Sequence, residues 1–244
     1  MKSNDREIDR SVAAVRNLDI EGPALPHLSV DEKSAVSVVC PEKTTKVFSP
    51  FFRFIKRFFD IVLSSFLLVV LSPLFLICYI AVKWGGGSAI YKQARIGKGG
   101  KSFKIYKFRS MREDAEKEGP QLSAPIEHEE RLTKVGRFLR SHHLDELPQL
   151  WNVFIGDMSF VGPRPERKYF IDKIMEKDKR YECLYAIRPG VTSYATLYNG
   201  YTDTLEKMLK RLNYDLYYLE HASVWFDLKI IFLTFISIFT GRKI

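Results

Sequence analysis

The sequence predicts a small α/β domain seated on a membrane, and three features of the chain predict this monotopic fold class. Residues 61–82 form an apolar run of about 22 residues without a charge, interrupted by a proline. Residues 89–112 have the composition of a β-hairpin with a glycine-rich turn. From residue 133 onward, apolar residues recur at helical spacing. We therefore expect a re-entrant broken helix, a short β-hairpin and interfacial amphipathic helices.

The chain divides into three parts by composition. Residues 1–47 are polar and mixed in charge, and we expect a loosely ordered tail without a secretory signal peptide. Residues 48–84 contain the apolar run and its aromatic, basic approach. Residues 85–244 would form a cytoplasmic domain that ends in an interfacial helix.

The amino-acid composition narrows the class of partner. Lys and Arg outnumber Asp and Glu by 38 to 29, and the net charge of +9 favours a polyanionic partner. The 18 Phe and 12 Tyr, with the apolar run, argue against a nucleic-acid-binding module. The three cysteines, Cys40, Cys78 and Cys183, are scattered, so we expect packing roles in a reducing compartment and no disulfide.

The apolar run could be an ordinary spanning helix, but two observations favour a helix that enters the membrane and returns. Pro73 removes the backbone hydrogen bond to Val69, and Ser72 can cap the carbonyl group that this frees. Basic residues also flank both ends of the run: Arg53, Lys56, Arg57, Lys83, Lys92, Arg95 and Lys98. A spanning helix would leave one basic cluster outside, so we predict that both ends face the cytoplasm.

The predicted hairpin turns at Gly97–Gly100 and is rich in cations, for which a solvated or lipid-facing surface is the simplest explanation. An acidic surface loop should follow over residues 113–130. A helix is then expected from Thr133, with Arg140 on a basic face that points toward Asp145.

We place the chemistry in residues 144–166, LDELPQLWNVFIGDMSFVGPRPE. Asp145 and Glu146 lie at or just before a helix N-terminus, where acidic residues can serve simply to start the helix. Arg164 lies between two prolines, and a guanidinium on such stiff backbone suits bidentate contact with phosphate. Two acids beside a fixed arginine suggest metal-assisted phosphoryl chemistry, in which the acids bind Mg²⁺ or attack phosphorus.

Three further helices and one strand are expected after this segment. A helix over residues 167–185 should lead through the turn at Arg188 into a strand. Residues 205–219 have helical periodicity. Residues 223–239 predict an amphipathic helix lying on the membrane, with a buried core helix as the alternative.

The segment 144–166 closely resembles the signature of the bacterial sugar transferases, the monotopic phosphoglycosyl transferases. The upstream stretches KRFFDIVLSS, QARIGKGGKSFKIYKFRSM and LTKVGRFLRS resemble the rest of that family's core, so the resemblance runs from about Phe54 to Phe239. A re-entrant helix with a Ser-Pro break, like Ser72-Pro73, is also typical of the family. The chain departs from the family at Gly87-Ser88, where Gly-Pro is usual.

The resemblance implies transfer of a sugar-1-phosphate from a UDP-sugar to a polyprenyl phosphate such as undecaprenyl phosphate, at the cytoplasmic face of the inner membrane. Asp145 would be the nucleophile and a ligand of Mg²⁺, giving a covalent aspartyl-phosphosugar intermediate, and Glu146 would be a helper carboxylate or base. The residues expected to bind substrate are Arg164, Arg109, Arg95, Lys107, Arg140 and Arg188.

The alternative is a non-catalytic, membrane-anchored protein whose cationic surface holds anionic lipid or a glycan polymer. Such a protein would lack a pair of carboxylates that converges with the cations. The sequence leaves open which sugar is used, which membrane glycan is made (exopolysaccharide, capsule, O-antigen or glycoprotein glycan) and whether the protein is a homodimer.

Overall fold

The computed structural model describes residues 40, 49–117, 119–122, 126, 129–200 and 202–240. All of them belong to one compact unit, residues 34–244. Apart from Cys40, the tail predicted over residues 1–47 lies outside the described residues.

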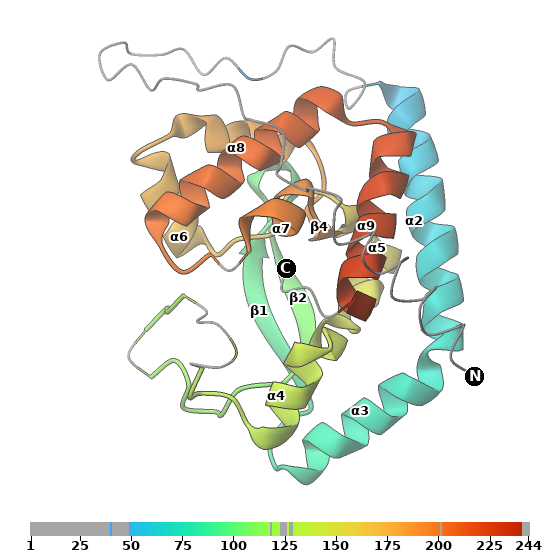
Figure 1. Ribbon diagram of the computed structural model, residues 1–244, viewed down its shortest axis with the longest axis vertical. Helices are drawn as coiled ribbons and strands as arrows, with labels where there is room; N and C mark the ends of the chain where they lie inside the picture. Colours follow the sequence, from blue (N-terminus) through green and yellow to red (C-terminus); the bar gives the residue numbers. More distant parts are fainter. Residues whose placement is uncertain are drawn as a thin grey trace, which may run out of the picture. The chain divides into compact units, whose positions relative to one another are not determined.

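The described chain contains mostly helices together with a few short strands, which confirms the predicted mixture of helix and strand (Figure 1). The elements are α2 (Pro50–Val70), α3 (Ser72–Trp84), β1 (Ile90–Ile96), η2 (Lys98–Gly100), β2 (Ser102–Phe108), α4 (Lys134–Ser141), η4 (Leu144–Glu146), α5 (Gln149–Ile155), β3 (Ser159–Val161), α6 (Lys168–Met175), η5 (Lys179–Ala186), β4 (Gly190–Thr192), α7 (Tyr194–Asn199), α8 (Leu205–His221) and α9 (Val224–Thr240), where η marks a 3₁₀ helix.

The predicted break in the apolar helix is confirmed. Helices α2 and α3 meet at Leu71 and are bent by 64° (Figure 1). Ser72 Oγ donates a hydrogen bond to the Val69 carbonyl at 2.8 Å, which satisfies the acceptor that Pro73 leaves without a backbone donor. Among the described residues, no single helix is long and apolar enough to cross a membrane, whereas this bent pair meets the requirement by length and composition alone.

Much of the apolar surface of the bent pair is exposed. The exposed side chains include Phe51, Phe54, Phe58, Phe66, Val69, Leu76, Ile77 and Trp84. A soluble domain rarely exposes so many large apolar side chains on neighbouring elements, so this surface requires a covering partner.

The predicted β-hairpin is also confirmed, and it packs against three helices, α3, α4 and α5. Strands β1 and β2 pair in antiparallel register from Ile90↔Phe108 to Ile96↔Ser102. Gly99 and Gly100, both at positive φ, form the turn. One core cluster joins the hairpin to α3 and α4, and a second cluster joins it to α5.

Strands β3 and β4 form a separate parallel pair, with Ser159 opposite Gly190 and Val161 opposite Thr192. The backbones next to these two strands approach so closely that a Cβ atom on Gly162 would lie 2.4 Å from the Arg188 carbonyl oxygen. The pair is tied to α2, because the Asp60 carboxylate accepts hydrogen bonds from Ser159 Oγ and Phe160 N, both at 3.0 Å.

The prediction of one helix over residues 167–185 is wrong. Helix α6 ends at Met175, and a 3₁₀ segment, η5, begins at Lys179. Asp178 has extended backbone geometry, and its side chain accepts a hydrogen bond from Arg180 N at 2.9 Å. An aspartate that caps a new turn in this way interrupts the continuous helix.

The expectation of no disulfide is also wrong. Cys40 and Cys183 form one, with a Cα–Cα distance of 5.3 Å. The pair is separated by 143 residues, so spacing along the chain carries no information about its proximity in the fold. Cys78 is a buried free thiol in the core between α3 and the hairpin, as a packing role requires.

Helices α8 and α9 are confirmed where the sequence predicted them, and α9 lies beside α2 (Figure 1). Lys56 of α2 pairs with Asp227 of α9 at 2.5 Å, and Tyr218 of α8 also donates to Asp227. Helix α9 buries Ile230 completely but leaves Trp225 82% exposed. One face of α9 therefore packs on the domain and another leaves apolar side chains uncovered, so the helix is apolar on both faces and the predicted amphipathic pattern is wrong.

Candidate active site

The carboxylate pair lies in the sharp connection between α4 and α5. His143 adopts a left-handed conformation (φ 55°), which turns the chain from α4 into the 3₁₀ segment η4 that carries Asp145 and Glu146. Helix α5 then begins at Gln149, so the predicted position just before a helix N-terminus is confirmed. Asp145 is buried and Glu146 is half-buried, and both line a cavity of about 560 Å³.

Most of the predicted cations line the same cavity as the carboxylates. They come from different elements: Arg95 from β1, Lys107 from β2, Arg109 from just after β2, Arg140 from α4 and Arg164 from the loop after β3. Arg188 is the exception, because it lines a second and much smaller cavity. The fold thus brings five of six predicted binding residues together with the two acids.

Glu146 is held between two of these cations. Its Oε1 atom accepts a hydrogen bond from Lys107 Nζ at 2.6 Å and lies 3.5 Å from Arg164 Nη2. Burial by itself would raise the pKa of Glu146, but the charges of Lys107 and Arg164 outweigh burial and hold this pKa well below its usual range. Glu146 is therefore ionised and anchored.

Asp145 is in the opposite situation. Burial raises its pKa, Lys107 offsets this only in part, and the neighbouring Glu146 charge raises the pKa further. Within the described residues no hydrogen bond fixes its carboxylate. Asp145 is thus the carboxylate whose oxygen lone pairs are available to an electrophilic or cationic ligand.

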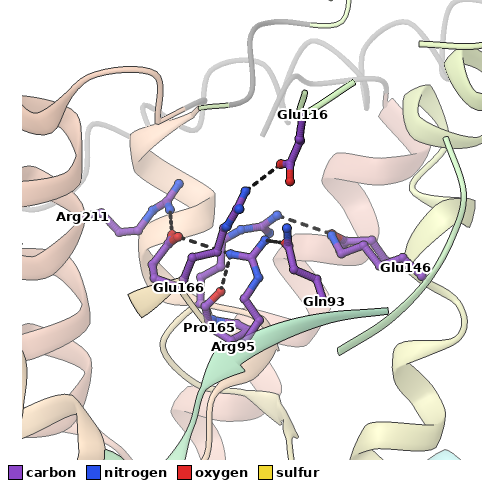
Figure 2. Close-up of polar contacts among 10 residues, drawn as sticks. Gln93, Arg95, Glu116, Glu146, Pro165, Glu166 and Arg211 are labelled. Carbon is purple, nitrogen blue, oxygen red and sulfur yellow. Dashed lines mark hydrogen bonds and ion pairs between the residues drawn. The ribbon is translucent and has the colours of Figure 1, made fainter. Parts of the chain in front are cut away.

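A second group of charges fixes the backbone next to Arg164 (Figure 2). Glu166 lies between Arg211 and Arg95, with Arg211 Nη1 at 2.7 Å from its Oε1 atom and Arg95 Nη1 at 3.5 Å from its Oε2 atom. Arg95 also donates to the Pro165 carbonyl at 3.1 Å and to Gln93. In this geometry Arg95 holds the Pro-Arg-Pro backbone, whereas the Arg164 side chain remains 37% exposed.

Sequence reasoning missed several charged residues of the cavity, notably Arg211, Arg167 and Glu116. Arg167 pairs with Glu116 at 2.6 Å, which links the start of α6 to the acidic loop. Arg211 offered a usable signal, because it adjoins Leu212 and lies one turn from Met208, both buried positions of α8. A charged residue on the buried side of an amphipathic helix indicates a polar partner in the interior.

The carboxylate pair also fits a magnesium ion by its chemistry. Among the described residues, no group of three or more His, Cys, Asp or Glu side chains gathers as a complete metal cage. Mg²⁺ does not require one, since one or two carboxylates together with substrate phosphates and water complete its coordination. Asp145, for which the described part of the chain provides no hydrogen-bond partner, would be the ligand.

Comparison with known families identifies the class of protein. Residues 51–241 match the family described as bacterial sugar transferase. Because this match covers well over half of the chain, the chain belongs to that family, and the resemblance found in the sequence is confirmed.

Individual relatives share the same region. The chain is 44% identical over 191 residues to a UDP-glucose:undecaprenyl-phosphate glucose-1-phosphate transferase of Klebsiella pneumoniae, covering 77% of this chain and 41% of the relative. It is 40% identical over 219 residues to the protein of the same name in Escherichia coli K12, covering 88% and 46%. It is 39% identical over 196 residues to the exopolysaccharide production protein PSS of Rhizobium leguminosarum bv. phaseoli, covering 78% and 97%. The chain thus spans less than half the length of the first two relatives.

Proposed function

We propose that the chain transfers a sugar-1-phosphate from a UDP-sugar to undecaprenyl phosphate or a similar polyprenyl phosphate. Membership of the family and the names of the relatives support this reaction. The observation that carries the proposal is the cavity in which Asp145 and Glu146 converge with five predicted phosphate-binding cations. Its volume of about 560 Å³ lies in the range that is usual for pockets that bind small molecules and cofactors.

The proposed reaction has two steps at one phosphorus atom. A carboxylate oxygen of Asp145 attacks the phosphorus that carries the sugar, the bond to the UMP oxygen breaks, and UMP leaves. An oxygen of the lipid phosphate then attacks the same phosphorus, and the Asp145 carboxylate is released. The covalent intermediate means that the two anionic substrates never react with each other directly.

The surrounding charges have distinct proposed roles. Arg164 would hold diphosphate oxygens, because its guanidinium is presented by a fixed backbone and is only loosely held by Glu146. Arg109 and Arg140 would neutralise the remaining phosphate charge. Glu146 would keep Lys107 and Arg164 in place as an ionised anchor. A Mg²⁺ ion held by Asp145 would supply further neutralisation of the diphosphate.

The proposed seat of the enzyme is the cytoplasmic leaflet of the inner membrane. The bent pair α2–α3 would enter the hydrocarbon region and return, and the exposed apolar face of α9 would lie at the interface. The cavity lining supports a lipid substrate, because it includes Thr234 and Ile238 of α9 as well as Asp145. A non-catalytic lipid- or glycan-binding protein is less well supported, since the two carboxylates lie among the cations of the cavity.

The proposal is tested by whether Asp145 becomes covalently modified by the donor substrate. Purified protein incubated with Mg²⁺ and a panel of UDP-sugars, without lipid phosphate, should gain the mass of a phosphosugar on the peptide containing Asp145. Asp145→Asn should abolish the adduct and lower turnover by several orders of magnitude, because the amide keeps the shape but is no nucleophile. The control is Asp172→Asn, which alters an exposed aspartate of α6 that pairs with Lys168 and does not line the cavity.

Two results would contradict the mechanism. An adduct that persists in Asp145→Asn but disappears in Glu146→Gln would exchange the roles of the two acids. Turnover without an adduct on any form of the protein would indicate direct attack by the lipid phosphate.

A further inference from the structure

Arg188 occupies a second cationic cavity that the proposed reaction does not use. This cavity of about 30 Å³ lies between the first turns of α2, the η2 turn and the chain that enters β4. Its charged lining residues are Arg53, Lys56, Arg57, Asp60, Lys98 and Arg188. Five cations and one acid therefore meet outside the cavity of Asp145.

Two of the five cations and the acid already have structural roles. Lys56 pairs with Asp227 at 2.5 Å. Arg57 donates to the Val153 and Phe154 carbonyl groups at the end of α5, at 2.6 and 2.8 Å. The Asp60 carboxylate accepts hydrogen bonds from β3. These contacts attach α2 to the domain.

The other three cations, Arg53, Lys98 and Arg188, come from three different elements. Within the described part of the chain, none of them forms an ion pair with a carboxylate. Arg188 Nε donates to the Gly156 carbonyl at 2.7 Å, which fixes its position. Burial, together with the charges of Arg53 and Arg188, lowers the pKa of Lys98. Asp60 is the acid that lines this cavity among the described residues, and its charge acts on Arg188 but is shared with Lys56 and Arg57. The fold thus holds more cations than acids together here, and an anion would relieve their repulsion.

The surroundings of this cavity indicate where the anion comes from. Phe51 and Phe54, in the same first turns of α2, are 73% and 72% exposed. Trp225 is also exposed and lies two residues before Asp227, the partner of Lys56. Exposed aromatic rings mixed with basic residues are typical of the headgroup level of a membrane.

We infer that Arg53, Lys98 and Arg188 bind the phosphate of an anionic phospholipid headgroup. The lipid would hold the first turns of α2 at the membrane surface, away from the cavity of Asp145. This inference rests on the membrane seat proposed above and not on the reaction. Because each cation near an anionic surface contributes about 1 kcal/mol, removal of one should weaken lipid binding about five-fold.

The test uses the full chain in a neutral maltoside detergent. Short-chain phosphatidylglycerol, short-chain phosphatidylcholine and inorganic phosphate are titrated separately, and bound ligand is followed by native mass spectrometry and by thermal unfolding. Phosphatidylglycerol should bind more tightly than phosphatidylcholine. Arg53→Gln and Lys98→Gln should each weaken its binding about five-fold. The matched control is Lys101→Gln, which removes an exposed cation at the end of the same turn, outside the cavity.

Each other outcome overturns the inference. Equal binding of both lipids, or an equal loss in Lys101→Gln, would show that no built site exists. Inorganic phosphate that binds as tightly as phosphatidylglycerol would make this a site for free phosphate. UMP release, measured on the same samples, separates the two proposals. A protein that releases no UMP can still prefer phosphatidylglycerol, and a protein that releases UMP can lack this preference.

Discussion

At the scale of single residues, the two neighbouring acids differ because of the cations around them. Lys107 and Arg164 hold Glu146 ionised, whereas burial and the adjacent charge raise the pKa of Asp145. Lys107 acts on both acids, since its charge lowers the pKa of each, although at Asp145 burial outweighs it. After burial, which raises the pKa of Asp145, this lysine has the largest influence on the pH at which the proposed nucleophile is ionised.

Replacement of Lys107 by methionine should shift the pH dependence of turnover. Without the lysine charge, the pKa values of Asp145 and Glu146 both rise, so more of each acid is protonated as pH falls. The acid limb of the pH–rate profile should move to higher pH, with a loss at about pH 6 roughly ten-fold larger than at about pH 8. UMP release measured across this range checks the prediction.

The control for this variant is Lys104→Met, which removes an exposed lysine from the same strand. It should leave the position of the acid limb unchanged. If Lys107→Met lowered turnover equally at every pH, the lysine would bind substrate without setting the ionisation of the acids.

Single site residues were predictable where the signal is local. The acids before Pro148 and the arginine between two prolines stand out in the sequence because proline restricts its neighbours. The Glu166–Arg211 pair was not predictable, because its members are 45 residues apart and meet only through the packing of α8. The position of Arg188 in a separate cavity likewise depends on where β4 pairs with β3.

At the scale of elements, the predictions that were confirmed depend on neighbouring residues, whereas the features that were missed depend on contacts between distant residues. The break at Ser72-Pro73, the hairpin turn and the start of α4, where Thr133 accepts a hydrogen bond from Gly136 N, all have short-range chemical causes. The parallel pair β3–β4 has only three residues in each strand. Its cause is the close approach of two glycines distant in sequence, Gly162 and Gly190.

Gly162→Ala should therefore disrupt the element that presents Arg164. A Cβ atom at this position would lie 2.4 Å from the Arg188 carbonyl oxygen and 2.9 Å from Gly190 N, and both are backbone atoms. The strands must separate, which should cost about 3 kcal/mol of folding stability and displace the arginine loop. Thermal unfolding in detergent and UMP release measure the two effects.

Gly85→Ala is the matched control, because its backbone has φ −72° and an added Cβ would meet the nearest backbone atom at 3.4 Å. It should unfold at the temperature of the unsubstituted protein. A Gly162→Ala protein that unfolds at that temperature too would show that the strand pair can relax without loss.

At the scale of the whole molecule, the domain holds the bent helix pair at its two outer ends, the first half of α2 and the second half of α3, where Cys78 and Val82 are buried in the core. Lys56, Arg57 and Asp60 anchor the first half of α2 to α9, α5 and β3. The second half of α2 leaves apolar side chains such as Phe66 and Val69 uncovered. The fold thus leaves side chains of the apolar run, residues 61–82, on the surface of the protein. The proposed seat in one leaflet depends on the bend at Leu71.

Two predictions in one labelling assay concern this seat. Cysteines introduced by Ser49→Cys, before α2, and Lys92→Cys, in β1, should both react with an impermeant maleimide from the cytoplasmic side only. Both substitutions are made in a protein whose Cys40, Cys78 and Cys183 are replaced by serine, and that protein provides the blank, because the cytoplasm would reduce the Cys40–Cys183 disulfide. Labelling of the two sites from opposite sides of the membrane would make the pair a spanning segment.

Pro73→Ala tests the cause of the bend in the same assay. Alanine restores the N–H group that can bond to the Val69 carbonyl, so α2 and α3 can join into one helix from Pro50 to Trp84. Such a helix would be about 50 Å long, which exceeds the hydrocarbon thickness of about 30 Å. A fraction of the protein should then expose the cysteine at position 92 on the far side. The opposing force is the positive-inside rule, because the crossing would carry Lys83 and Arg95 with it, so the two topologies should coexist.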